Sequence, residues 1–207
     1  MHESTESVLE GVCRQLIAQC PHIQFGVARW PADLEAVYRL RYREVIERGW
    51  AEPNDFPDGL EQDIYDERAI QIAGWHGDTL AATLRVVLPN PNHLLPTESA
   101  FDLIMEPRGK IVDVGRTVVA PDYRDSLQHR VLFGLLGQMA LEVQARGFSE
   151  VCGTMSDPVI ALYRKIGVDV AVEGPMRPYW NEVRYPCRYD LLKSAITIKQ
   201  RTSAIVG

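Results

Sequence analysis

The chain has 207 residues, 46% of them hydrophobic, and its 28 acidic and 22 basic side chains give a net charge of -6. A chain of this length can bury a sizeable core as a single domain without disulfide or metal staples. The acidic balance and the lack of any Lys/Arg-rich run exclude nucleic acid as the main partner, because phosphate binding requires a basic stripe. We therefore expect one domain spanning residues 1–207.

Cysteine, histidine and apolar patterns narrow the class of protein further. No C-x-x-C pair occurs among the four cysteines, which is typical of reduced thiols rather than of a disulfide framework or a zinc site. The five histidines show no metal-ligand spacing. The N-terminus lacks a basic region followed by an apolar run, and no stretch reaches the roughly 20 apolar residues of a membrane span. These patterns predict a cytoplasmic protein without a metal site.

The first third of the chain predicts two helices, a strand and a long loop. Apolar residues recur at helical spacing within residues 1–20, and residues 22–30 (HIQFGVARW) have the composition of a strand. Pro31 suits the first turn of a second helix, which we expect to end near Gly49. Residues 51–67 are rich in Pro, Gly and Asp, which predicts a loop of a length that usually has a function.

A hairpin and a further strand follow. Residues 69–76 and 79–88 flank Gly77-Asp78, a two-residue turn signal, and residues 90–99 are typical of a loop. In the next predicted strand, residues 110–121, regular alternation would place Asp113 and Arg116 on opposite faces. Gly115, which lies between them, predicts a bulge that brings them together.

Residues 112–170 are the most informative segment. After the break at YRDS (residues 123–126), the apolar residues from Leu127 to Val143 form one face of a long helix that ends at Arg146-Gly147. The strand EVCGTM (residues 150–155) follows. This order places a helix N-terminus beside two strand ends, and its unpaired amides can hold an anionic cofactor tail.

The C-terminal part predicts a well-framed helix and two more strands. Asp157 is expected to be the N-cap residue of this helix, with Pro158 in its first turn and Gly167 after its end. Strands at residues 169–176 and 181–192 complete a mixed sheet. The tail, residues 195–207, has no assigned structure.

These segments together resemble a known superfamily. VDVGRTVVAP, YRDS, the long helix, EVCGTM and SDPVIALYRKIGV resemble, in this order, the cofactor half of the GNAT acyltransferases. The pieces RLRYREVIERGW, EQDIYDE, TLAATLRVVLP, LLPTESAF and VDVGRTVV are similar to acyl-homoserine-lactone synthases and N-acyl amino acid synthases, and the resemblance covers most of residues 39–170. It implies an α/β (α+β) fold: a mixed, largely antiparallel sheet, flanked by helices, with a V-shaped split between two central strands.

The resemblance also implies a charged cluster around the amine substrate. The matching positions are Arg41, Trp50, Asp63, Asp66, Arg85, Asp113 and Arg116. From the residues alone, Asp63 and Asp66 suit turn caps as well, whereas Arg85 in an apolar strand requires a carboxylate partner, for which we expect Asp63 or Asp66. Val45 stands where the lactone synthases usually have an aromatic residue, and Asp113 where they have a glutamate. These differences leave an N-acyl amino acid synthase at least as well supported.

Thioester aminolysis requires a neutral amine, donors for the oxyanion and a route for the leaving thiolate. By resemblance, the backbone amides near Val118 and Val119 bind the oxyanion and pantetheine, Tyr163 protonates the sulfur and Ser156 binds pantetheine. Asp113 is the candidate that positions or deprotonates the amine. Structural readings stay open, because Tyr163 also lies on the apolar stripe of its helix and Asp113 could form an ion pair with Arg116.

The donor loop departs from the superfamily pattern. Residues 124–129 (RDSLQH) stand where members that use acetyl-CoA have Q/R-x-x-G-x-G/A, and both glycines are missing. Side chains would crowd a diphosphate there, and Asp125 would repel it. We therefore expect an acyl carrier protein, bound through its phosphopantetheine near Arg124 and Ser126. The basic patch expected to bind this acidic partner consists of Arg124, His129, Arg130, Arg164 and Lys165.

The sequence thus predicts an N-acyltransferase that moves a fatty acyl group from a thioester, on acyl carrier protein or CoA, to the amine of an amino acid or a derivative. Three alternatives stay open: an acyl-homoserine-lactone synthase that uses S-adenosylmethionine, an acetyl-CoA-dependent N-acetyltransferase of a small amine, and a non-catalytic acyl-binding module. The acyl pocket is expected between the splayed strands. Candidates for its lining are Leu103, Ile104, Met105 and Met155.

Overall fold

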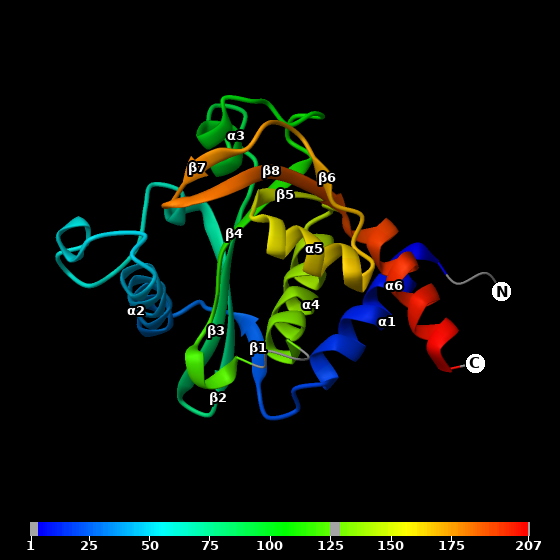
Figure 1. The fold of residues 1–207 in the computed structure, drawn as a ribbon. Helices are drawn as coiled ribbons and strands as arrows, with labels where there is room; N and C mark the ends of the chain where they lie inside the picture. Colours follow the sequence, from blue (N-terminus) through cyan, green and yellow to red (C-terminus); the bar gives the residue numbers. More distant parts are fainter. Residues whose placement is uncertain (1–3, 125–128, 207) are drawn as a thin grey trace.

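The computed structural model describes residues 4–124 and 129–206, and for residues 202–206 only the backbone. Within these residues, eight strands form one open sheet in the order β1-β2-β3-β4-β5-β8-β6, and β7 pairs with β8 (Figure 1). Only the central pair β4–β5 is parallel among the described strands. The strands are β1 (Gln24–Val27), β2 (Ala69–His76), β3 (Thr79–Val87), β4 (Ile111–Val119), β5 (Glu150–Met155), β6 (Ala171–Val172), β7 (Arg177–Tyr179) and β8 (Glu182–Asp190). The predicted mixed, largely antiparallel sheet is confirmed.

The predicted helices are confirmed, with small shifts at their ends. They are α1 (Thr5–Ala18), α2 (Pro31–Glu47), α4 (Arg130–Ala145) and α5 (Asp157–Ile166). The predicted start of α4 at Leu127 lies outside the described residues. Ser156, not Asp157, is the N-cap residue of α5, and Gly167 ends the helix at φ 107° as expected.

Three elements were absent from the sequence analysis. Helix α3 (Pro96–Phe101) lies in the predicted loop, where the Glu98 carboxylate accepts the Leu95 N–H at 2.7 Å and stabilises the first turn. The strand β7 lies between the two predicted strands, residues 169–176 and 181–192, and β6 is shorter than the first of them. The tail forms helix α6 (Leu191–Val206), which packs Leu191 and Ala195 into the core.

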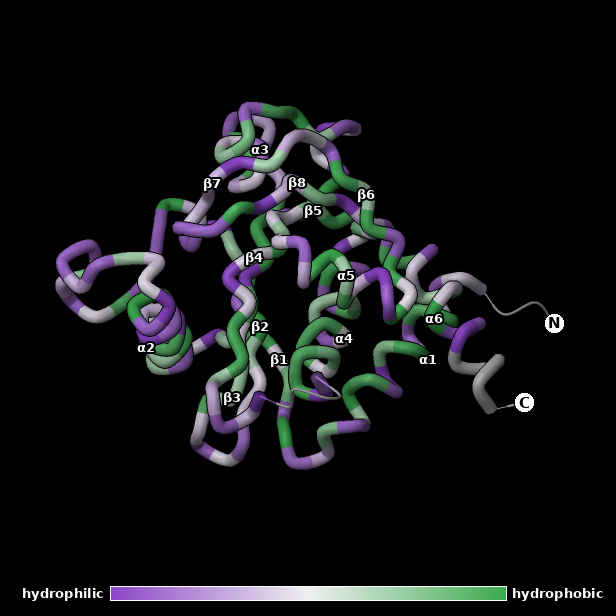
Figure 2. The backbone as a smooth tube through the Cα atoms, in the orientation of Figure 1, coloured by the Kyte–Doolittle hydropathy of each residue, from purple (hydrophilic) through white to green (hydrophobic). Residues whose placement is uncertain are grey.

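Helices cover the sheet on both faces. Helix α4 packs Leu135, Met139 and Val143 against one face, with α1 beside it, while α2 lies on the other face (Figure 1). Hydrophobic residues are frequent along the central strands and α4 (Figure 2). Val37 and Leu40 of α2 form a second, smaller core with β2 and β3. Because helices cover both faces, a site that reaches both faces has to pass through the sheet itself.

The sheet splits at its centre. Strands β4 and β5 are in register only from Ile111–Asp113 against Glu150–Cys152, and they separate beyond this point. Gly153 stands at the apex of the split, where an added Cβ would lie 2.4 Å from the carbonyl oxygen of Val114. The predicted V-shaped split between the central strands is therefore confirmed.

A bulge in β4 lies beside the split. The register with β3 shifts between Thr83 and Arg85, and Arg116 opposite them adopts φ 53°. The expected bulge is confirmed, although the left-handed residue is Arg116 rather than Gly115. As a result, both Asp113 and Arg116 line one cavity.

We predict that Gly153→Ala destabilises the protein by about 1–3 kcal/mol, because the added methyl group would overlap a backbone oxygen that cannot move without shifting β4. The measurement is denaturant unfolding. Gly26→Ala in β1 is the control, since no heavy atom of the described chain lies within 4 Å of its Cβ position. Equal stability of the two variants would show that the apex is not tightly packed.

Candidate active site

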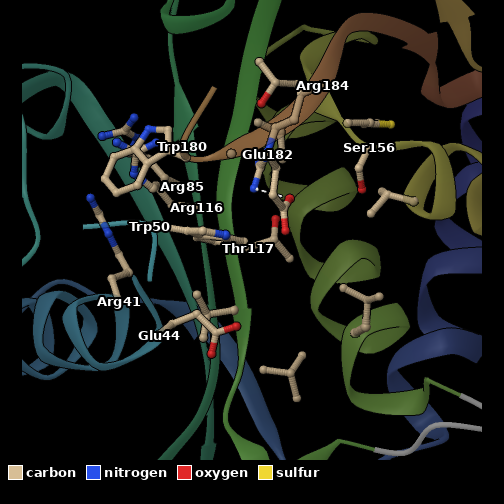
Figure 3. A pocket seen from close by; sticks show the side chains of 18 of the residues that line it. Arg41, Glu44, Trp50, Arg85, Arg116, Thr117, Ser156, Trp180, Glu182 and Arg184 are labelled. Atoms are coloured by element: carbon tan, nitrogen blue, oxygen red, sulfur yellow. Dashed lines mark hydrogen bonds and ion pairs between the residues drawn. The ribbon is translucent and has the colours of Figure 1, made fainter. Parts of the chain in front are cut away.

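A cavity of about 670 Å³ passes through the split. Its lining comes from β4, from α4 and α5 on one face of the sheet, and from α2, the loop after it and the β7–β8 hairpin on the other. Figure 3 shows Arg41, Arg85 and Trp180 on one side and Ser156 on the other. The side between α4 and α5 is apolar and includes Val131, Leu132, Met155, Val159 and Leu162.

The predicted pocket lining is correct only in part. Met155 lines the cavity, but Leu103 and Met105 pack in a separate core cluster beneath α3, and Ile104 is 44% exposed. The sequence analysis missed the lining residues of α4 and α5 because the apolar faces of these helices match ordinary core packing. Their exposure to a cavity follows only from the separation of β4 and β5.

A buried ion-pair network forms the wall on the α2 side. Arg41 of α2 contacts both oxygens of Asp66 at 2.7 and 3.0 Å and also binds Glu61. Arg116 of β4 donates to Glu61 and to Asp63, each at 3.0 Å. The arginines come from secondary-structure elements and the acids from the Pro/Asp-rich loop, so the network fixes this loop to the sheet.

Arg85 of β3 completes the network. Its Nη1 lies 2.6 Å from Asp63 and 3.0 Å from Asp66, so both expected ion pairs of Arg85 are present. The formal charges of the arginines and acids named in the network cancel, as burial requires. The sequence analysis did not single out Glu61, although it lies in the EQDIYDE piece. Asp63 and Asp66 stand behind the cavity wall, whereas Glu61 lines it.

The network sets the protonation of its members. Burial alone would raise the pKa of Asp66, but hydrogen bonds from Arg41 and the charges of Arg41 and Arg85 lower it below its ordinary value. Burial disfavours the charged form of Arg116, and the charges of Glu61 and Asp63 outweigh burial and raise its pKa. Asp66 and Arg116 therefore stay ionised in the folded protein at neutral pH.

We predict that Asp66→Asn lowers the free energy of unfolding by about 3–5 kcal/mol at pH 7, because it leaves Arg41 and Arg85 short of a buried anion. The folded-state pKa of Asp66 lies below its ordinary 3.8, so its contribution is complete above that pH and is lost as pH falls through the folded-state value. Urea unfolding at decreasing pH should show wild type and variant converging.

The control for this prediction is Glu10→Gln, which removes an exposed i,i+4 pair with Arg14. An exposed pair contributes less than about 1 kcal/mol. A similar loss in the two variants would contradict a special role for the buried network.

Asp113 forms no ion pair with the network, although the charge of Arg85 acts on it. Its side chain is 3% exposed at the edge of the cavity, and its Oδ2 accepts the Thr97 N–H at 2.8 Å and the Cys152 thiol at 3.6 Å. Burial raises the pKa of this carboxyl, and the hydrogen bonds from Thr97 oppose that shift. The structural alternative of an Asp113–Arg116 ion pair is wrong, since Arg116 binds Glu61 and Asp63 instead.

The backbone of β4 presents its last amide to the split. Ala120 N–H donates to Ala81 at 2.8 Å, so by antiparallel alternation the Val119 amide points away from β3, toward the gap. Val118, opposite Thr83, directs its amide to β3. Of the two predicted oxyanion donors, Val119 alone is therefore oriented for that role.

Arg124 and Ser126, the predicted donor-binding residues of the loop after β4, are not both seen free in the cavity. Arg124 donates to the Val119 carbonyl oxygen at 2.8 Å and binds Glu44, so it is already partnered inside the protein. Ser126 lies outside the described residues. Arg164 of the expected basic patch donates to the Val170 carbonyl oxygen. Of these two arginines of the patch, Arg124 is neutralised by a carboxylate, whereas Arg164 keeps its charge at an exposed position.

Tyr163 and Ser156 of the α5 region both line the cavity. The Ser156 hydroxyl makes no capping hydrogen bond with α5, which leaves it available at the cavity wall. Tyr163 is buried against Tyr189, with ring centroids 5.9 Å apart, and burial raises the pKa of its phenol. At neutral pH the phenol is a proton donor, as a general acid must be.

The β7–β8 hairpin adds residues that sequence reasoning missed. Trp180 and Asn181 both adopt φ 53° at its tip, and Asn181 Nδ2 donates to the Gly49 carbonyl oxygen at 2.8 Å, just after α2. Trp180 covers Arg116, with 4.4 Å from the guanidinium to the ring centroid. No local motif marks these residues, because their place in the site depends on a contact between distant segments.

Trp50, which the sequence predicted as a substrate-binding residue, lines the cavity beside this hairpin. The guanidinium groups of Arg48 and Arg184 lie 5.0 and 4.8 Å from the centroid of its ring system. Trp50 is therefore more than a core residue beneath the loop, since it also forms part of the polar side of the cavity.

Two kinds of feature are absent from the described residues. No helix there is long and apolar enough to cross a bilayer. In residues 4–124 and 129–206, no three His, Cys, Asp or Glu side chains group as metal ligands would.

A split sheet with a cavity through the split, flanked by an apolar wall and a charged one, defines a GNAT-like acyltransferase. The family model of the N-acyl amino acid synthase FeeM matches residues 36–188. The chain belongs to this family and is an acyltransferase enzyme.

Solved structures share the fold at low sequence identity. The N-acyl amino acid synthase FeeM from uncultured soil microbes aligns with TM-score 0.64 and 12% identity, over 84% of this chain and 93% of that one. The acyl-homoserine-lactone synthase LasI aligns with TM-score 0.69 and 17% identity, over 86% and 94%. The CoA-dependent synthase BjaI, solved with SAM and isopentyl-CoA, aligns with TM-score 0.66 and 22% identity, over 81% of each chain. No curated protein sequence matches the chain significantly.

Proposed function

We propose that this protein moves a fatty acyl group from a phosphopantetheine thioester to the amine of an amino acid or a derivative. The observation that carries the proposal is the two-sided cavity: an apolar part between α4 and α5 suits an acyl chain, and a charged part beside α2 suits a polar acceptor. Its volume is ample for a long chain, whereas an acetyl group needs no such space.

The residues around the split supply the parts that aminolysis requires. The amine nitrogen attacks the thioester carbonyl carbon, the Val119 N–H stabilises the oxyanion, and the carbon–sulfur bond then breaks. Asp113 accepts the proton lost by the amine, directly or through water, while Tyr163 protonates the departing sulfur. Ser156 holds the pantetheine arm. Arg41, Arg85 and Arg116 are held by Asp63, Asp66 and Glu61 as a rigid wall for the acceptor, with Trp50 beside it.

We further propose an acyl carrier protein as the donor. Arg124, which the sequence predicts to bind the phosphopantetheine, already binds Glu44, and Glu44 is shared with Arg48. Binding a CoA diphosphate would require breaking this pair, whereas the single phosphodiester of a carrier protein makes a smaller demand and its protein surface adds contacts.

We predict that the enzyme converts dodecanoyl thioesters and free amino acids into N-dodecanoyl amino acids, at least about 10-fold faster than it transfers an acetyl group. The assay pairs dodecanoyl-carrier protein, dodecanoyl-CoA or acetyl-CoA with a mixture of amino acids or with S-adenosylmethionine, and mass spectrometry identifies the products. Lactone formed from S-adenosylmethionine would favour the lactone synthase instead. Acetylated products would favour an acetyltransferase, and binding without turnover an acyl-binding module.

A substitution in the cavity sharpens this prediction. Leu162→Trp should fill the apolar part, shifting the preference from dodecanoyl toward shorter donors by about 10-fold or more. Ile104→Trp is the control, because Ile104 is exposed outside the cavity. An unchanged chain-length preference in Leu162→Trp would argue against an acyl chain between α4 and α5.

We predict that Asp113→Asn lowers kcat by about 100-fold or more while the protein stays folded, because the amide oxygen still accepts the Thr97 N–H but the proton acceptor is lost. In wild type the rate should rise with pH as Asp113 ionises, with a midpoint above its ordinary pKa. The variant should lose this limb of the pH profile. Glu98→Gln, which affects only the frame of α3, should keep it.

A further inference from the structure

Arg184 is the cationic side chain of the cavity whose hydrogen bonding is least complete. It lies on β8, 18% exposed, and its Nη2 lies 3.1 Å from the Glu182 carboxylate. Its Nε is buried and has no hydrogen-bond partner among the described residues. A buried donor without an acceptor costs free energy, so the guanidinium of Arg184 is not fully paired within the described protein.

The backbone of the hairpin aims Arg184 into the cavity. Glu182 and Arg184 alternate with Val183, which is exposed on the opposite face of β8. The bond from Asn181 to Gly49 holds this end of β8 over the end of α2. Figure 3 shows Arg184 and Glu182 pointing toward Trp50 and Thr117 inside the cavity.

The charge around Arg184 is incompletely balanced. Burial lowers the pKa of its guanidinium, and the nearby charge of Arg116 adds to that shift, while Glu182 opposes it. A lowered pKa in an arginine means that the surroundings hold too little negative charge for the buried cation. An anion bound here would therefore be stabilised.

The other arginines of the cavity differ from Arg184. Arg41, Arg85 and Arg116 each contact two carboxylates of the network. The Nε of Arg85 is also buried without an acceptor, but two carboxylates balance the charge of Arg85. Arg48 and Arg124 are more than 40% exposed, so water can satisfy their remaining donors. Arg184 alone, among the described arginines that line the cavity, combines burial with a single carboxylate partner.

We propose that Arg184 binds the carboxylate of the acceptor and so selects free amino acids over amines that lack a carboxylate. Its two terminal nitrogens form a fork that matches a carboxylate, and the Trp50 ring centroid lies 4.8 Å from the guanidinium. Glu182 faces the same space and suits the ammonium group with which a free amino acid arrives at neutral pH. This inference rests on the proposed function, because it names the recognition element for the acceptor.

Binding of product-like probes tests the inference without turnover. The probes are N-decanoylglycine, which carries the carboxylate, and N-decanoylglycinamide, its neutral isostere, measured by calorimetry below their micelle-forming concentrations. Wild type should bind the acid about 10- to 100-fold more tightly than the amide, as expected for a charge-assisted bond in a half-buried site. Arg184→Met should lose this preference while still binding the amide.

Arg177→Met is the matched control. Arg177 stands opposite Arg184 in the β7–β8 register, but its guanidinium binds Asp102 at 2.6 Å, and Arg177 does not line the cavity. This variant should keep the wild-type preference for the acid. If Arg184→Met loses its cooperative melting transition, Arg184→Lys takes its place, and its preference should then be reduced.

The outcomes separate this inference from the function on which it rests. Equal binding of both probes to wild type, or an unchanged preference in the Arg184 variant, would overturn the role of Arg184 and leave the acyl cavity intact. Binding of neither probe to wild type would overturn the proposed function itself.

Discussion

The separation of β4 from β5 is the constraint on which the site depends. Parallel strands normally continue their ladder, and stopping it leaves backbone amides that need other partners. Here the ladder stops after Asp113 and Cys152, and the Val119 amide faces the gap. Gly153 allows the closest approach of the strands at the apex, so the gap opens over a short distance. One interrupted ladder therefore creates the opening, the free amide and the passage between the faces of the sheet.

The two sides of that passage are stabilised by different forces. Between α4 and α5 the wall is apolar, and its shape follows from how these helices pack on the sheet. On the α2 side the wall is a set of ion pairs, whose geometry is fixed because an unpaired buried charge is costly. The β7–β8 hairpin closes this side through Asn181 and Trp180. The site for an apolar donor and a polar acceptor thus arises because the helices on one face of the sheet provide an apolar wall and the segments on the other face provide a charged wall.

The sequence predicted the structural features that are determined by residues close together in the chain. The hairpin turn at Gly77-Asp78, the framing of α5 and the bulge near Gly115 all depend on neighbouring residues, and the structure contains each of them. The partners of Arg85 followed from the cost of burying a charge.

Features that depend on distant contacts could not be predicted in the same way. Glu44 neutralises Arg124 across the cavity mouth, and this pairing required knowledge of how α2 sits on the sheet. Trp180 and Arg184 belong to a segment whose composition resembles an ordinary edge hairpin. Helix α6 was also missed, because its contacts with α1 and β8 identify its role only in three dimensions.

The ion-pair network also has a consequence for how the chain acquires its structure. Its arginines lie on α2, β3 and β4, and its acids lie on the loop between α2 and β2. No short segment of the chain can therefore neutralise its own charges. A partly assembled sheet would bury some of these groups before their partners arrive, which disfavours such intermediates. The same residues that shape the acceptor wall therefore make assembly of this half of the protein an all-or-none event.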